Sequence, residues 1–273
     1  MKKSYFNLEP NELLINNKVP YEYIGEGNAV FEKFAQEMVE CIEENNKEGR
    51  NTVFIVPVGP VGQYPYFVDI VNKKRISLKN CYFLNMDEYL DDNKQYIPKT
   101  DKLSFRGFME FEVYDKIDSD LTVPVDQRFF PDPSDPENLQ NVITRLGGVD
   151  MAFGGIGING HIAFNEAEDD TPVEEFATRE TRAIRISRET RVANSIGDLN
   201  GALDAMPHYA AIIGMRQILG AKKIRLLVFR AWQQAVLRQT MFGKVESHFP
   251  STLLQNHPDV IIYANEIASQ RPF

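Results

Sequence analysis

The sequence is short of cysteine, of positive charge and of long apolar runs, and each shortage narrows the class of protein. Its two cysteines, Cys41 and Cys81, lie in a helical and a strand-like apolar pattern, which favours buried free thiols over a disulfide. With 30 Lys and Arg against 39 Asp and Glu, the net charge of −9 argues against nucleic-acid binding through bulk electrostatics. No apolar run approaches the ~20 residues that span a membrane.

The chain also lacks a repeat of fixed period, a low-complexity tract and an apolar signal core behind its first lysines. We therefore expect a cytoplasmic protein with no membrane partner. Its 273 residues, 43% of them hydrophobic, suffice for one large α/β domain or two small ones. Residues 1–25 are mixed in character and contain two prolines, so we expect an N-terminal arm there.

Short apolar runs alternate with helical patterns along the rest of the chain. The expected strands are TVFIVPV, CYFLNM, VDMAFGG, YAAIIG, IRLLVF and VIIYAN. Apolar residues at helical spacing predict a helix from Asn28 that ends before Gly49, and further helices near 64–72, 104–114 and 136–146 and in AWQQAVLRQTMFG. This alternation predicts an α/β fold with a mainly parallel sheet and helices on both faces.

Ligands of such sheets bind beyond the carboxyl ends of the strands. Four segments follow expected strands and are candidates to line one crevice: 57–65, 87–92, 154–166 and the turn after Phe229. The charged stretch of about 167–200 has no clear strand partner, so we expect a lid or an excursion from the sheet there.

The stretch GGIGINGHIAFNEA collects glycines around one imidazole. Backbone without side chains can approach a ligand closely, and free N–H groups there can hold an anion, which makes Gly155, Gly157 and Gly160 candidate binding residues. His161 exchanges protons near neutral pH, and Glu166 could orient it or act itself. A tight turn with a hydrogen-bonded histidine is the structural alternative.

Two further strand ends carry candidate residues. In NMDEYL, the neighbouring carboxylates Asp87 and Glu88 repel one another, so one could have a raised pKa and act as a general base. The alternative is a helix-capping pair or a solvated loop. In VPVGPVGQYP, Gly59 and Gly62 suggest an anion-holding turn, but the stretch lacks the Lys and Ser/Thr of a P-loop, and a plain apolar turn explains it equally well.

These motifs, in this order, resemble the glucosamine-6-phosphate deaminase (isomerase) family, which is related to the 6-phosphogluconolactonases. The similar stretches are NMDEY, GGIGINGHIAFNE, ETRVANS, MPHYAAIIG and LLQNHPDVII, and with their spacing they cover roughly residues 28–266. The ending GHIAFNE is the deaminase form, which makes a lactonase the minor alternative.

The resemblance implies a single Rossmann-like α/β domain over residues 26–273 with a lid, and possible assembly into a homo-oligomer. It implies that an amino sugar phosphate ring is opened, a proton moves between C2 and O1, and ammonia leaves, with no metal and no organic cofactor. By resemblance, Asp87 is the base at C2, and His161 assists ring opening with Glu166 in the same relay.

The sequence departs from the family at functional positions. Asn159 stands where the family has an aspartate of the histidine relay, and an amide cannot stabilise an imidazolium by charge. Three phosphate contacts are also missing. The loop 58–61 has no hydroxyl residue, Ile196 stands at the place of a family arginine, and Gln233 at that of a family lysine.

Arg230 and Arg216 each follow an expected strand and are candidate replacements for the lost cations, the alternative being surface ion pairs. We weigh three hypotheses. The first is an active sugar enzyme with a substrate altered from glucosamine-6-phosphate. The second is the family's standard deamination with a rebuilt phosphate site. The third is a catalytically weak relative that binds a metabolite.

Overall fold

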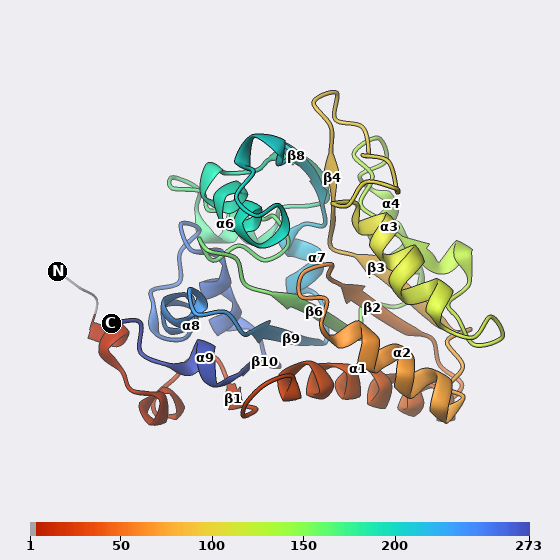
Figure 1. Ribbon diagram of the computed structural model, residues 1–273, viewed down its shortest axis with the longest axis horizontal. Coiled ribbons are helices and arrows are strands. Elements are labelled where there is room, and N and C mark those ends of the chain that lie inside the picture. Colours follow the sequence, from red (N-terminus) through yellow and green to blue (C-terminus); the bar gives the residue numbers. More distant parts are fainter. Residues whose placement is uncertain (1–3) are drawn as a thin grey trace.

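A seven-stranded, wholly parallel sheet organises the computed structural model, which describes residues 4–273 (Figure 1). Residues 1–3 of the expected N-terminal arm lie outside the described residues. The strands, in their order across the sheet, are β1 (Tyr21–Tyr23), β10 (Val260–Ala264), β9 (Lys223–Val228), β6 (Met151–Gly155), β2 (Thr52–Val56), β3 (Cys81–Asn85) and β5 (Arg128–Phe129). The parallel sheet predicted from the sequence is therefore confirmed.

Helices cover both faces of this sheet, because its central strands are apolar on both sides. All five residues of β2 are buried, and Phe54 and Ile55 point into different cores. The helices are α1 (Ala29–Lys47), α2 (Gln63–Lys74), α3 (Phe105–Phe108), α4 (Asn138–Arg145), α5 (Val173–Ala177), α6 (Arg188–Asp198), α7 (Met215–Leu219), α8 (Gln233–Phe242) and α9 (Glu266–Ser269). Side chains of α1 and α2 pack on one face, and those of α4, α7 and α8 on the other.

The longest helix follows the apolar spacing of its sequence. Phe34, Met38 and Ile42 of α1 are buried at intervals of four residues, so one stripe of the helix faces the sheet. The chain leaves the helix at Glu48, and Gly49 then adopts a φ of +67°, a conformation that costs glycine little. No helix within residues 4–273 is long and apolar enough to cross a membrane.

A second, three-stranded sheet corrects two expectations. Asp87–Leu90, expected as the start of a polar loop, is strand β4, and Tyr209–Ile212, expected in the parallel sheet, is β8. Both pair antiparallel in the order β4-β8-β7, with β7 spanning Arg182–Arg185. All four residues of β4 are buried by this sheet and the segments packed on it. No local sequence pattern predicts this burial.

The order in which the chain adds strands to the main sheet reverses between β2 and β6. The chain runs outward from β2 to β3 and β5 on one side, and from β6 to β9 and β10 on the other. The loops after β2 and β6 therefore diverge, which opens a crevice at the carboxyl ends of these strands.

The two segments expected outside the sheet are both structured. The expected arm includes two 3-10 helices, Ser4–Asn7 and Pro10–Leu14, and ends in β1, which pairs with β10 at the sheet edge. The expected lid contains α5, β7 and α6, and Figure 1 shows α6 with β4 and β8 above the main sheet.

Candidate functional site

A cavity of about 560 Å³ lies at the crevice, and all four of the loops predicted from the sequence line it. Its wall includes Pro57–Gly62 after β2, the start of β4, Gly155–Gly157 after β6, and the turn between β9 and α8. Residues of α6 close the remaining side. Four segments far apart in the sequence thus converge because their strands end at one edge of the sheet.

Asp87 presents an acid to this cavity. Its side chain is 8% exposed, and within residues 4–273 its carboxyl group has no hydrogen bond or ion pair to the protein. Burial, with a smaller contribution from the neighbouring Glu88, raises the pKa of Asp87 from 3.8 to about 8. A buried, unpaired carboxyl group with a pKa near neutrality is suited to taking and returning a proton.

Glu88 does not line the cavity. Its carboxylate is fully buried and accepts hydrogen bonds from the backbone N–H groups of Tyr89, Phe105 and Arg106, at 2.8, 3.0 and 2.8 Å, and from the hydroxyl of Ser104 at 3.0 Å. These bonds join the first turn of α3 to β4. The structure therefore makes Glu88 an anchor for Asp87 and does not bring it to the candidate reaction site.

His161, Asn159 and Glu166 form the relay that the sequence suggested. The Oδ1 atom of Asn159 lies 2.8 Å from Nδ1 of His161, and the amide Nδ2 donates to Oε2 of Glu166 at 2.5 Å. The same Oδ1 atom also accepts the backbone N–H of His161 at 3.3 Å. The amide therefore lies between the imidazole and the carboxylate.

This arrangement fixes the tautomer of the imidazole. Since the amide nitrogen of Asn159 faces a carboxylate, its oxygen must face His161, and Nδ1 must carry the proton. Nε2, which has no hydrogen bond to residues 4–273, is then left as the acceptor on a side chain that lines the cavity. Burial lowers the pKa of His161, while the charge of Glu166 opposes that effect.

Two hydroxyl residues complete the relay, and sequence reasoning did not assign them. Thr190 is fully buried, donates from Oγ1 to Glu166 at 3.1 Å, and lies 3.2 Å from Nδ1 of His161. Ser187 caps α6 through its hydroxyl, and its backbone N–H donates to Glu166 at 3.1 Å. A serine before a helical stretch is a capping signal, but nothing local links it to a carboxylate 21 residues earlier.

The glycines of the site have separate roles. A Cβ atom on Gly157 would lie 1.9 Å from the His161 ring, so only glycine leaves the imidazole in place. A Cβ atom on Gly160 would meet Phe249 at 2.6 Å, and one on Gly62 would meet Phe31 at 2.7 Å. Gly59, Gly62, Gly155 and Gly157 line the cavity, whereas Gly160 does not border it.

Gln233 lines the cavity, and its amide forms three hydrogen bonds with backbone groups. Oε1 accepts the N–H groups of Phe229 and Arg230 at 2.8 and 2.9 Å, and Nε2 donates to the carbonyl of Ile156 at 2.9 Å. The side chain therefore fastens the turn after β9 to the loop after β6. Both lone pairs of Oε1 are thereby used, and one N–H of Nε2 is left as an uncharged donor.

The two candidate arginines lie in different places. Arg230 borders the cavity, and its guanidinium has no hydrogen bond or ion pair within residues 4–273. Arg216 forms an ion pair with Glu180 and does not border the cavity. Lys102 is a second cation on the cavity wall, where its Nζ donates to the carbonyl of Asp198 at 2.5 Å.

Cys41 and Cys81 are both free thiols. Within residues 4–273, no group of three or more His, Cys, Asp or Glu side chains is arranged to hold a metal ion.

Comparisons with known proteins agree with the fold. No protein-family model matches the chain. It is 29% identical over 245 residues to glucosamine-6-phosphate deaminase of Mycoplasma mycoides subsp. mycoides, covering 88% of this chain and 93% of that protein. It is 28% identical over 247 residues to glucosamine-6-phosphate deaminase of Bacillus velezensis, covering 88% and 95%.

Two solved structures share the architecture. A monomeric glucosamine-6-phosphate deaminase superposes with a TM-score of 0.79 at 23% identity, covering 92% of this chain and 98% of that one. The 6-phosphogluconolactonase from Trypanosoma brucei superposes with a TM-score of 0.65 at 14% identity, covering 93% and 98%. At these identities, the two structures establish a common fold.

Proposed function

We propose that the chain is an enzyme of the glucosamine-6-phosphate deaminase and isomerase family, to two of whose members it is 28–29% identical, and that it moves a proton between C2 and O1 of an amino sugar or sugar phosphate whose ring it first opens. One observation carries the proposal. The unpaired carboxyl group of Asp87 and the imidazole of His161 line one cavity, beyond the carboxyl ends of β3 and β6, the two strands that flank β2.

Asp87 acts as the base at C2. A proton shift next to a carbonyl needs a group that can hold the proton while the carbon is planar and then deliver it to a neighbouring atom. A carboxyl group with a pKa of about 8 can do both near neutral pH. Glu88 supports it by fixing the strand on which Asp87 lies.

His161 acts at the ring oxygen. With Nδ1 donating to Asn159, Nε2 can take the proton of the sugar's anomeric hydroxyl and pass a proton to the ring oxygen as the ring opens. Glu166 holds the relay through Asn159 and Thr190, and its charge favours the imidazolium that forms in this step.

We further propose that the substrate differs from glucosamine-6-phosphate. The amide of Gln233 carries no charge and is held by three bonds to backbone groups, and the side chain of Ile196 cannot pair with an anion. Each charge-assisted hydrogen bond that a phosphate loses costs about 1.5–3 kcal/mol of binding free energy. An unphosphorylated amino sugar or a sugar acid suits this cavity better.

A second candidate is deamination of glucosamine-6-phosphate with a rebuilt phosphate site. It is favoured by Arg230 and Lys102, because both cations border the cavity and the guanidinium of Arg230 is unpaired within residues 4–273. The third hypothesis, a weakly catalytic metabolite binder, is favoured by the uncharged Asn159 in the relay.

A thermal-shift screen distinguishes the three hypotheses on function. The purified protein is tested with amino sugars, each with and without its phosphate, and with sugar acids, while product and ammonia are assayed in parallel. We expect stabilisation and turnover with an unphosphorylated amino sugar or a sugar acid, and loss of turnover in Asp87→Asn. Turnover of glucosamine-6-phosphate that depends on Arg230 favours the second candidate, and binding without turnover of any sugar favours the third.

A further inference from the structure

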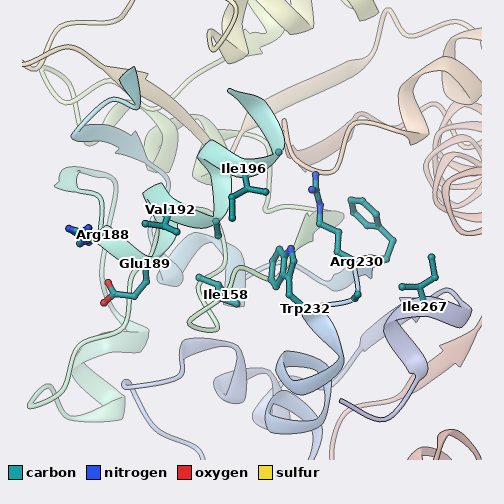
Figure 2. A pocket seen from close by; sticks show the side chains of 12 residues that line it. Ile158, Arg188, Glu189, Val192, Ile196, Arg230, Trp232 and Ile267 are labelled. Atoms are coloured by element: carbon teal, nitrogen blue, oxygen red, sulfur yellow. The ribbon is translucent and has the colours of Figure 1, made fainter. Parts of the chain in front are cut away.

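A second cavity, with a volume of about 790 Å³, adjoins the first and is lined mainly by apolar side chains (Figure 2). Val192 and Ile196 enter it from α6, Ile158 from the loop after β6, Trp232 from the turn before α8, and Ile267 from α9. Arg188 and Glu189 lie on the side of this apolar pocket opposite Arg230 (Figure 2).

The apolar pocket is continuous with the catalytic cavity. Ala193, Gly197, Phe229, Arg230 and Trp232 border both spaces, so a molecule bound at Asp87 and His161 can extend from one into the other. The two spaces meet at the junction of α6 with the turn between β9 and α8.

The walls of the apolar pocket remain open to solvent although they are hydrophobic. Ile196 is 67% exposed, Ile267 52%, and Val192 and Trp232 37% each. Several large apolar side chains from four separate segments seldom face the same solvent-filled space unless something covers them. A small-molecule site has this composition, with a few polar groups at its edge.

We propose that the apolar pocket is a substrate subsite that takes an apolar group, aryl or short alkyl, carried by the sugar at the end remote from C1 and C2. This inference rests on the proposed function, because the reaction at Asp87 and His161 fixes which end of the sugar lies in the catalytic cavity. A phosphate would find Arg230 at the junction and Arg188, beside Glu189, on the opposite side, and between them the apolar side chains of Ile158, Ile196 and Trp232. An apolar group would remove those three side chains from water.

Calorimetric binding of matched sugars tests the subsite. The probes are glucosamine, glucosamine-6-phosphate and 6-O-benzylglucosamine, measured on the full chain carrying Asp87→Asn so that binding is read without turnover. We expect the benzyl sugar to bind about tenfold tighter than glucosamine or more, because it buries the ring against Trp232 and Ile196.

Variants of pocket residues test whether the tighter binding of the benzyl sugar arises in the apolar pocket. In Ile196→Asp and Trp232→Ala, we expect glucosamine and 6-O-benzylglucosamine to bind with dissociation constants that differ by no more than about twofold. The control Val125→Asp changes an aliphatic side chain that is 77% exposed elsewhere on the surface, and it should keep the ratio. Circular dichroism confirms that each variant folds, and the less disruptive Ile196→Thr replaces any that does not.

Three results would overturn the subsite. They are equal affinity for the two unphosphorylated sugars, a tenfold preference that survives both pocket variants, and a native dimer that Ile196→Asp dissociates, since a second copy would then cover the pocket. If the benzyl sugar binds through the pocket but the native protein turns over no sugar, the subsite stands and the proposed function fails.

Discussion

Asn159 determines how charge is arranged around the candidate catalytic imidazole. As an amide, it passes a hydrogen bond from His161 to Glu166 without adding a charge of its own. The nearest carboxylate oxygen then lies 3.7 Å from Nδ1 of His161, too far for a direct hydrogen bond. The residue therefore keeps the geometry of a relay while weakening its electrostatic part.

Asn159→Asp should raise the pKa of His161, because it places a carboxylate in direct hydrogen-bonding contact with Nδ1. If formation of the imidazolium limits ring opening, turnover of an accepted sugar should increase about tenfold or more. NMR titration of the His161 ring and steady-state kinetics measure the two effects, with the isosteric Asn159→Leu as the uncharged control. A raised pKa with unchanged turnover would mean that the relay does not limit the rate.

Asp87 makes the reaction depend on pH. A base must be ionised before it can take a proton, and the pKa of this carboxyl group is about 8 in the free protein. We expect kcat/KM to rise with pH up to about 8 and then to level off. Asp87→Asn should lower kcat/KM by about 10²–10⁴-fold. A pH profile that is flat between 6 and 9 would exclude Asp87 as the base.

At the scale of elements, α6 links the candidate lid to the reaction site. Its N-cap residue Ser187 and, in its first turn, Thr190 both donate to Glu166, and Asn194 in its later part donates to the hydroxyl of Tyr89 at 3.1 Å. Its exposed Ile196 belongs to the apolar pocket. We propose that movement of this segment, about residues 167–200, would separate the relay from its hydroxyl partners.

Thr190→Val should lower turnover about tenfold, because it keeps the shape of the side chain but removes the O–H donor to Glu166. The helix cap should survive, since the bond from the Thr190 backbone N–H to Ser187 Oγ remains. Thr190→Ser is the matched control and should restore turnover. If all three proteins are equally active, Thr190 has a packing role only.

The elements differ in how far the sequence predicts them. The stripe of α1 and the apolar runs of β2, β6 and β9 are local patterns, and the structure confirms them. The strand β4 could not be predicted, because its two acids are typical of a loop. Glu88 can be buried because Ser104, Phe105 and Arg106, which are distant in sequence, donate hydrogen bonds to its carboxylate.

At the scale of the whole molecule, the candidate site lies where the parallel sheet meets the small antiparallel sheet. The parallel strands bring the loops together, and the sequence predicted this from the rule that ligands bind beyond the carboxyl ends of parallel strands. The contacts of Thr190 and the occupation of Gln233 needed the folded chain, since each joins segments at least 24 residues apart.

Burial of Asp87 should also affect global stability. Its pKa is raised from 3.8 to about 8, so between these values the folded chain holds a proton that the unfolded chain has lost. The free energy of unfolding should therefore fall as pH rises from 4 to 8, by up to ~1.4 kcal/mol per pH unit from this group. Above about pH 8 its contribution should be constant.

Asp87→Asn removes this proton linkage and should be more stable than the native chain by an amount that grows between pH 5 and 8. Denaturant unfolding at intervals of one pH unit measures the difference, and Asp126→Asn, at an exposed position, serves as the control. Parallel curves for the native chain and Asp87→Asn would contradict the raised pKa.

The bonds of Gln233 limit which side chains this position tolerates. Its one amide joins the turn after β9 to the loop after β6 through three backbone groups. A lysine at this position has no acceptor, so Gln233→Lys would release two N–H groups while it introduces a cation. A lysine at this position therefore requires other groups in the two loops to satisfy these N–H groups, and the single substitution would weaken the contact between the loops.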